Sequence, residues 1–188
     1  MLALAIQYAG QLQAGYQAAL MDDKYRFYWQ GASHGYFVPL EQDDSRKLQY
    51  VSVGVYGDVL GFFECNLNRD TMTAYNVTAM RFAPGHGTEF AADMYRFVVD
   101  LLFKQYGINR VVFNVIVGNP AERLYDRICE RYGGRVIGTF TQEARLRDGR
   151  LYDVKYYEML KGECLSLLED AGAEMYRLKL FMEVEHNV

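Results

Sequence analysis

The chain has 188 residues, of which 51% are hydrophobic and 15% aromatic, so a single domain with a substantial core is expected. Its net charge of −4 argues against nucleic-acid binding, which needs a basic face. Cys65, Cys129 and Cys164 are widely spaced and form no C-x-x-C pair, which argues against a metal site and favours a reduced, cytoplasmic protein. Residues 1–20 lack a basic region and are interrupted by glutamines, so we expect neither a signal peptide nor a membrane span.

The N-terminal part of the chain predicts helix followed by loop. Apolar residues recur at spacings of three and four over residues 2–20, which predicts an amphipathic helix. Residues 22–29 predict a short second helix that begins at an aspartate N-cap. Residues 30–48 are rich in Gly, Ser and Asp and predict a loop, in which Tyr36 and Phe37 form an aromatic lip.

Three runs rich in β-branched and aromatic residues follow, and they predict three successive antiparallel strands. Gly57-Asp58 between the first two runs is a hairpin signal. The three runs are Tyr50–Tyr56, Val59–Leu67 and Thr71–Phe82.

The second half of the chain alternates helical and strand patterns. Asn119-Pro120 is typical of a helix start, because Asn caps the first turn and Pro fits its first position. The order of elements predicts an α/β (α+β) fold with a mixed, mostly antiparallel central sheet flanked by helices. The expected elements are a helix over 90–102, a strand over 108–117, a helix from 119 to 133, a hairpin of 135–145 and 151–160, and an amphipathic helix over 163–185.

A glycine pair lies between the third strand and the following helix, in the run Gly85, His86, Gly87 and Thr88. Backbone N–H groups and the dipole at a helix N-terminus can bind a phosphate. The alternative is a tight strand-to-helix turn, in which Pro84 and the glycines serve geometry alone. No Lys-Ser or Lys-Thr follows, which excludes a Walker loop, and the Rossmann motif G-x-G-x-x-G is incomplete.

The segment after the buried strand carries a more specific pattern. Asn119, Ala121, Leu124, Tyr125 and Gly133 match in spacing and order a run found in the GNAT N-acetyltransferase superfamily, which the chain resembles. The resemblance implies a GNAT-like acyl-CoA N-acyltransferase fold with an extra C-terminal helix. Within one domain of 1–188, it implies a variable region at 1–47, a core at 48–160 and an appended helix at 161–188.

The resemblance implies an N-acetyltransferase that uses acetyl-CoA as co-substrate and needs no metal. The acceptor would be a primary amine of a small molecule or peptide, attacking directly in a ternary complex. Phe82 departs from the family, which usually has Arg or Gln at this position, so fewer side-chain contacts to phosphate are expected. The implied cofactor-binding residues are Met80, Arg81, Phe82, Gly85, His86, Gly87, Thr88, Asn119 and Tyr125.

Tyr125 stands where the family often places the acid that protonates the departing thiolate. The alternative is a half-buried tyrosine that packs on the sheet. The general base is open, because Asn76 occupies the position of the glutamate used in the histone-acetylating branch. Glu64, after an apolar pair, is our candidate, with Glu143 or a water molecule held near Tyr75 as alternatives.

We expect Tyr36, Phe37 and Tyr75 to line the substrate cleft. Two other functions stay open at this point. A GNAT-fold module could bind CoA as a regulatory ligand without turnover, or the chain could be a structural dimerising protein. The final helix over 163–185 would pack on its own domain or on the partner subunit of a homodimer.

Overall fold

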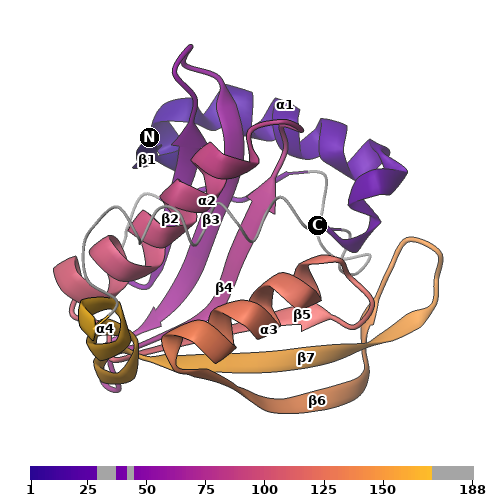
Figure 1. The fold of residues 1–188 in the computed structure, drawn as a ribbon. Helices are drawn as coiled ribbons and strands as arrows, with labels where there is room; N and C mark the ends of the chain where they lie inside the picture. The colour runs from indigo at the N-terminus through magenta and orange to yellow at the C-terminus, as the bar shows by residue number, and fades with distance from the viewer. Residues whose placement is uncertain (29–36, 42–44, 171–188) are drawn as a thin grey trace.

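The computed structural model describes residues 1–28, 37–41 and 45–170. In this part of the chain, seven strands form one sheet in the order β1-β2-β3-β4-β5-β7-β6, and β4–β5 is its one parallel pair (Figure 1). The mixed, mostly antiparallel sheet confirms the expected fold class. The strands are β1 (Leu2–Leu4), β2 (Lys47–Val53), β3 (Val59–Asn68), β4 (Thr73–Arg81), β5 (Arg110–Ile116), β6 (Gly134–Arg145) and β7 (Leu151–Leu160).

Helices cover both faces of the sheet. One run of helix continues from α2 into η3, whose hydrogen bonding is of the rare π type, a detail that the apolar periodicity did not indicate. The helices are η1 (Ala5–Tyr8), α1 (Ala9–Met21), η2 (Asp23–Tyr28), α2 (Gly87–Tyr95), η3 (Arg96–Gln105), α3 (Ala121–Tyr132) and α4 (Lys161–Asp170).

Two adjacent phenylalanines in β3 show how the two faces are built. Successive strand residues point to opposite faces, so Phe62 and Phe63 enter different cores. Phe62 packs with Tyr16 of α1 on one face. Phe63 stacks on Phe90 of α2 and Phe97 of η3 on the other, with ring centroids 4.7 and 5.5 Å apart. The core on this second face also includes residues of α3 and α4.

The N-terminal prediction is partly wrong, because residues 2–4 form β1 rather than the first turn of the expected helix. Leu2 pairs with Ser52 and Leu4 with Tyr50, so hydrogen bonding to the edge of β2 prevails over the helical pattern. The regular helix α1 begins at Ala9. The first part of the expected helix over 163–185 is present as α4, and the prediction for residues 171–185 lies outside the described part of the chain.

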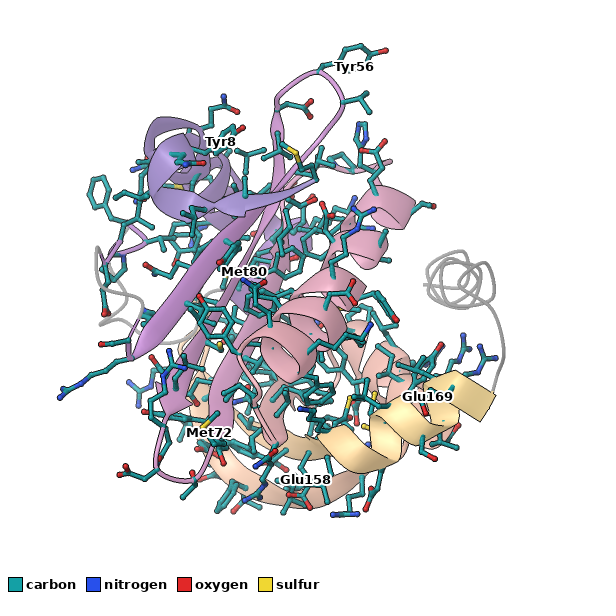
Figure 2. The ribbon with its side chains drawn as sticks, turned by 90° about the vertical axis from the view of Figure 1, so that its left-hand side faces the viewer. Tyr8, Tyr56, Met72, Met80, Glu158 and Glu169 are labelled. Carbon is teal, nitrogen blue, oxygen red and sulfur yellow. The ribbon has the colours of Figure 1, made fainter. Side chains whose placement is uncertain are left out.

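The β2–β3 hairpin projects from the top of the molecule, and Tyr56 lies at its tip (Figure 2). The side chain of Tyr56 is 92% exposed. None of the helices in the described residues has the length and hydrophobicity that a membrane crossing requires.

Candidate active site

The parallel strands β4 and β5 separate along their length, and this splay is the centre of the candidate site (Figure 1). They pair at Thr73–Arg110, Ala74–Val111 and Val77–Phe113, and the register shifts between Ala74 and Val77. Asn76, within that bulge, has a φ of 52°, an uncommon left-handed conformation for a residue with a side chain. Beyond Val77 the two strands no longer pair with each other, so in the described residues no strand pairs with the edge of β4 that faces β5.

The backbone N–H and C=O groups of successive β4 residues point alternately toward β3 and toward β5, and this decides which groups face the splay. Phe82 N–H donates to the Leu60 carbonyl in β3, and Met80 pairs with Phe62 in β3. The N–H and C=O groups of the intervening Arg81 therefore point to the opposite edge, toward β5. Of the three expected backbone positions, Arg81 is thus the one that presents both groups to the splay, whereas Met80 and Phe82 direct their N–H groups to β3.

Two tyrosines of η2 reach the end of β4. Tyr28 Oη accepts a hydrogen bond from Arg81 N–H at 3.0 Å and donates one to the Arg81 carbonyl at 3.1 Å. Tyr25 Oη donates to the Phe82 carbonyl at 3.1 Å. The backbone of η2 is kinked at Tyr25, and the rings of Tyr25 and Tyr28 lie side by side with their centroids 5.2 Å apart. Local sequence patterns do not indicate these contacts, because they join residues more than fifty positions apart.

The loop at residues 85–88 has the geometry of an anion site. Gly85 has a φ of 88°, which favours glycine, and α2 begins two residues later at Gly87. The first N–H groups of a helix have no partner within the helix, so those of Gly87, Thr88 and Glu89 are available to a ligand. His86 Nδ1 lies 3.7 Å from Glu89 Oε2, and both side chains are exposed.

Asn119 lies at the start of α3, where its side chain caps the helix. Its Oδ1 accepts a hydrogen bond from Ala121 N–H at 3.0 Å, and its carbonyl accepts one from Glu122 N–H at 2.9 Å. Asn119 thus satisfies the first N–H of α3 as expected, but Pro120 rather than Asn119 occupies the N-cap position, because α3 begins at Ala121. The cap uses the Oδ1 atom alone and leaves the Nδ2 group of Asn119 available as a donor.

Tyr125 lies one turn into α3, with its ring held edge-on by two aromatic neighbours. The ring centroids of Phe113 and Tyr157 lie 5.2 and 6.0 Å away, at interplanar angles of 79° and 77°. Burial, with a smaller effect of Tyr28, raises the pKa of Tyr125 to about 12. The phenol therefore stays protonated at neutral pH, as a proton donor must.

A cavity of about 60 Å³ opens beneath the splay, between the sheet and helices α2, η3, α3 and α4. Its wall is almost wholly apolar, and Tyr125 forms part of it. The residues that line it from the splay are Val77, Thr78, Ala79 and Phe113. Tyr125 thus faces the space that the separation of β4 and β5 creates.

Glu64 lies in β3 opposite Thr78, and its surroundings differ from the apolar context that we expected. Lys47 Nζ lies 3.1 Å from Glu64 Oε2, and Gln49 Nε2 donates to the same oxygen at 3.1 Å. The neighbouring β2 strand supplies both groups, which sequence reasoning could not pair with Glu64. The other carboxylate oxygen accepts no hydrogen bond from the residues that the structure describes.

The structure describes only two of the three residues that we expected to line the substrate cleft. Tyr36 lies outside the described residues. Phe37 is 64% exposed, and Tyr75 is 42% exposed at the start of the β4 bulge. No contact between Phe37 and Tyr75 occurs in the described part of the chain.

A larger polar cleft, which the sequence did not predict, lies between η2 and the β6–β7 turn. It has a volume of about 620 Å³, and its charged lining residues are Asp22, Asp23, Arg26, Arg147 and Asp148. Phe27 fixes η2 beside this turn by packing with residues at the end of β5 and in the hairpin. Asp23 and Arg26 line the cleft, whereas Tyr25 and Tyr28 bond to β4, so η2 separates the cleft from the splay.

Asp148 at the rim of this cleft is held by two hydrogen bonds. Tyr152 Oη donates to its Oδ2 at 2.6 Å and Arg150 N–H donates to its Oδ1 at 2.9 Å. These two hydrogen bonds hold the pKa of Asp148 below its usual value. Among the residues that the structure describes, no group of three or more His, Cys, Asp or Glu side chains is placed to hold a metal ion.

No protein-family model and no curated protein matches this chain. Its fold is similar to that of solved N-acetyltransferases. One is the spermidine/spermine N-acetyltransferase SpeG from Vibrio cholerae in complex with manganese ions, with 25% identity and a TM-score of 0.56 over 65% of this chain and 70% of that one. A point mutant of spermidine N-acetyltransferase SpeG from the same organism matches with 26% identity and a TM-score of 0.55 over the same shares.

The fold and its similarity to these enzymes support an N-acetyltransferase of the acyl-CoA N-acyltransferase fold. The same similarity supports membership of the GNAT superfamily, which the sequence resembles.

Proposed function

We propose that this protein is an acetyl-CoA-dependent N-acetyltransferase that modifies a primary amine of a small cationic molecule. The observation that carries the proposal is the open edge of β4 in the splay, beside Tyr125. This edge fits the amide-rich arm of CoA, because an extended ligand can pair with it as an added strand would. Acetyl-CoA supplies the acetyl group as a thioester.

The chain's own groups hold the co-substrate at three places. The backbone of Arg81 pairs with the pantetheine arm, and the N–H groups of Gly87 and Thr88 hold the pyrophosphate. Asn119 Nδ2 donates to the arm from the opposite side of the splay. His86, at the start of α2, lies beside the pyrophosphate.

Tyr125 serves as the acid. The amine nitrogen bonds to the thioester carbonyl carbon, the carbon–sulfur bond breaks, and Tyr125 Oη gives its proton to the sulfur. The proton lost by the amine balances the one gained by the sulfur, so the products are an amide and free CoA. Glu64 is the candidate acceptor of the amine proton, through the carboxylate oxygen that Lys47 and Gln49 leave unoccupied.

The acidic cleft on the other side of η2 from the splay attracts the cationic acceptor to this end of the protein. Three aspartates and two arginines line it, which leaves a net negative charge that attracts a cationic amine. The SpeG enzymes that resemble this chain act on spermidine and spermine, which are cations of this kind. A polyamine or similar alkylamine is therefore the class of acceptor that we propose.

The test is a titration followed by an assay. Isothermal titration with acetyl-CoA should show saturable binding, and thiol release should then appear with spermidine or spermine, with an acetylated product in the mass spectrum. Binding without release from any amine in a panel would point to the regulatory module instead. Absence of binding would contradict the proposal.

A matched pair of variants tests the acceptor route. Asp23→Asn should raise the KM for spermidine roughly three- to tenfold, because one attractive charge is lost near the entry. Asp70→Asn, on an exposed turn at the far end of β3 and β4, is the control and should leave that KM unchanged. An unchanged KM for Asp23→Asn would move the acceptor site away from this cleft.

A further inference from the structure

The apolar cavity under the splay extends farther than the transfer of an acetyl group requires. One end of it lies at Ala79 and Tyr125, beside the open edge of β4. The other end is lined by Ile128 and Tyr132 of α3 and by Leu168 of α4. Leu168 is 3% exposed, so α4 closes this end of the cavity.

The topology gives the cavity a direction. Because β4 and β5 are parallel, the helices that follow them, α2 and α3, both begin at the same end of the two strands, their C-terminal end. A ligand held at the N-terminus of α2 therefore enters near the start of α3. Ile128 and Tyr132 follow Tyr125 by three and seven residues, so they share its face of the helix and lie roughly 5 and 10 Å farther from the entry.

The sheet confirms that the cavity continues past the splay. The last pair between the two strands before they separate is Val77–Phe113, and it forms the floor of the splay. Val111 pairs with Ala74 below that floor, yet Val111 still lines the cavity. An extended ligand that reaches Tyr125 with its reactive end thus has apolar space beyond that end.

We propose that this space holds the acyl chain of an acyl-CoA, and that the protein transfers short straight-chain acyl groups such as butyryl in preference to acetyl. The inference rests on the proposed function, because it needs the thioester to lie at Tyr125. An apolar cavity of this kind stays free of water and binds hydrocarbon. The reaction is the same transfer, in which the butyryl carbonyl carbon forms the amide and free CoA leaves.

The size of the cavity sets the chain length. At roughly 10–15 Å³ for each water, the cavity of about 60 Å³ has room for a few carbon atoms. Each buried methylene strengthens binding by about fourfold. Butyryl, with two methylenes more than acetyl, should therefore bind on the order of tenfold more tightly, and chains that exceed the cavity should lose this gain.

The experiment compares CoA with acetyl-, propionyl-, butyryl- and octanoyl-CoA, by isothermal titration and by thiol release with one amine. The dissociation constant should fall from acetyl to butyryl and rise for octanoyl. Val98→Phe, which adds a ring to the η3 wall of the cavity, should reduce the butyryl-to-acetyl ratio of kcat/KM to about one or below. Leu168→Ala, which enlarges the closed end, should move the optimum to a longer chain.

The outcomes separate this inference from the proposed function. Binding of CoA and acetyl-CoA without any gain for butyryl-CoA would overturn the acyl site and leave the acetyltransferase intact. If Val98→Phe weakens free CoA as much as butyryl-CoA, the cavity holds the pantetheine arm and the inference is wrong. If no CoA compound binds, both the function and the inference fail. Should Val98→Phe not fold, the chain-length series and Leu168→Ala decide the matter without it.

Discussion

The Tyr28 hydroxyl group hydrogen-bonds both the N–H and the C=O of Arg81, at 3.0 and 3.1 Å. These are the backbone groups that we assign to the pantetheine arm, so Tyr28 and an acyl-CoA compete for them. The ligand must break this contact to bind. Removing the hydroxyl group therefore removes a competitor.

Tyr28→Phe should lower the dissociation constant for acetyl-CoA by roughly two- to tenfold, since one or two ordinary hydrogen bonds no longer have to be exchanged. Tyr25→Phe is the matched control. It removes a hydrogen bond to the Phe82 carbonyl, and Phe82 directs its N–H to β3 rather than to the splay. Calorimetric titration of both variants measures the effect, and weaker binding by Tyr28→Phe would show that the hydroxyl group assists the ligand.

The glycine turn before α2 supports a second prediction. Gly87→Glu should abolish binding of acetyl-CoA, because a carboxylate would lie at the helix N-terminus where the pyrophosphate belongs. Gly10→Glu adds the same charge to α1, where a Cβ atom meets nothing within 4 Å, and should bind normally. Unchanged affinity in Gly87→Glu would remove this loop from the site.

Gly61 is a position where stability depends on close contact. A Cβ atom there would clash with the Phe90 ring and with the Met80 carbonyl oxygen, which is backbone and cannot move aside. Gly61→Ala should lower the free energy of unfolding by about 1–3 kcal/mol or more. Gly10→Ala, in an open helix position, should raise it by about 0.5–1 kcal/mol. Urea denaturation measures both, and equal stability of the two variants would contradict the packing of α2 on β3.

The raised pKa of Tyr125 predicts the shape of the pH profile. A phenol with a pKa of about 12 keeps its proton throughout the working range, so the acid form is lost only in strong alkali. The kcat should rise with pH as the amine loses its proton, with no descending limb up to about pH 10. A descending limb that begins near pH 9 and disappears in Tyr125→Phe would show that burial does not raise this pKa.

The sequence predicted those parts of the fold that local patterns determine. The β-rich runs located β2, β3 and β4, and Asn119-Pro120 located the start of α3, because periodicity and capping act over a few residues. β1 was missed, since the same three residues fit a helical stripe and only pairing with β2 decides their state. Only about a third of the expected 163–185 helix, up to residue 170, is described, and Leu168 within it packs into the core of this chain.

The candidate site was less predictable from the sequence, because much of it depends on contacts between distant segments. Asn119 and Tyr125 follow from spacing within one helix, whereas the contact of Tyr28 with Arg81 and that of Lys47 with Glu64 join distant segments. The acidic cleft combines η2 with the β6–β7 turn, which are more than a hundred residues apart. One local signal of the acidic cleft was present in the sequence, because Asp22, Asp23 and Asp148 all stand in polar turns that flank predicted elements.

The role of Tyr125 is the most direct test of the account. Tyr125→Phe keeps the ring between Phe113 and Tyr157 and removes only the hydroxyl group, which makes no hydrogen bond to the described residues. Thermal stability and acetyl-CoA affinity should stay near those of the wild type. The kcat, measured by thiol release with a saturating amine, should fall roughly ten- to a thousandfold. Full activity in Tyr125→Phe, with wild-type affinity for acetyl-CoA, would contradict the assignment of the acid and reduce Tyr125 to a packing residue.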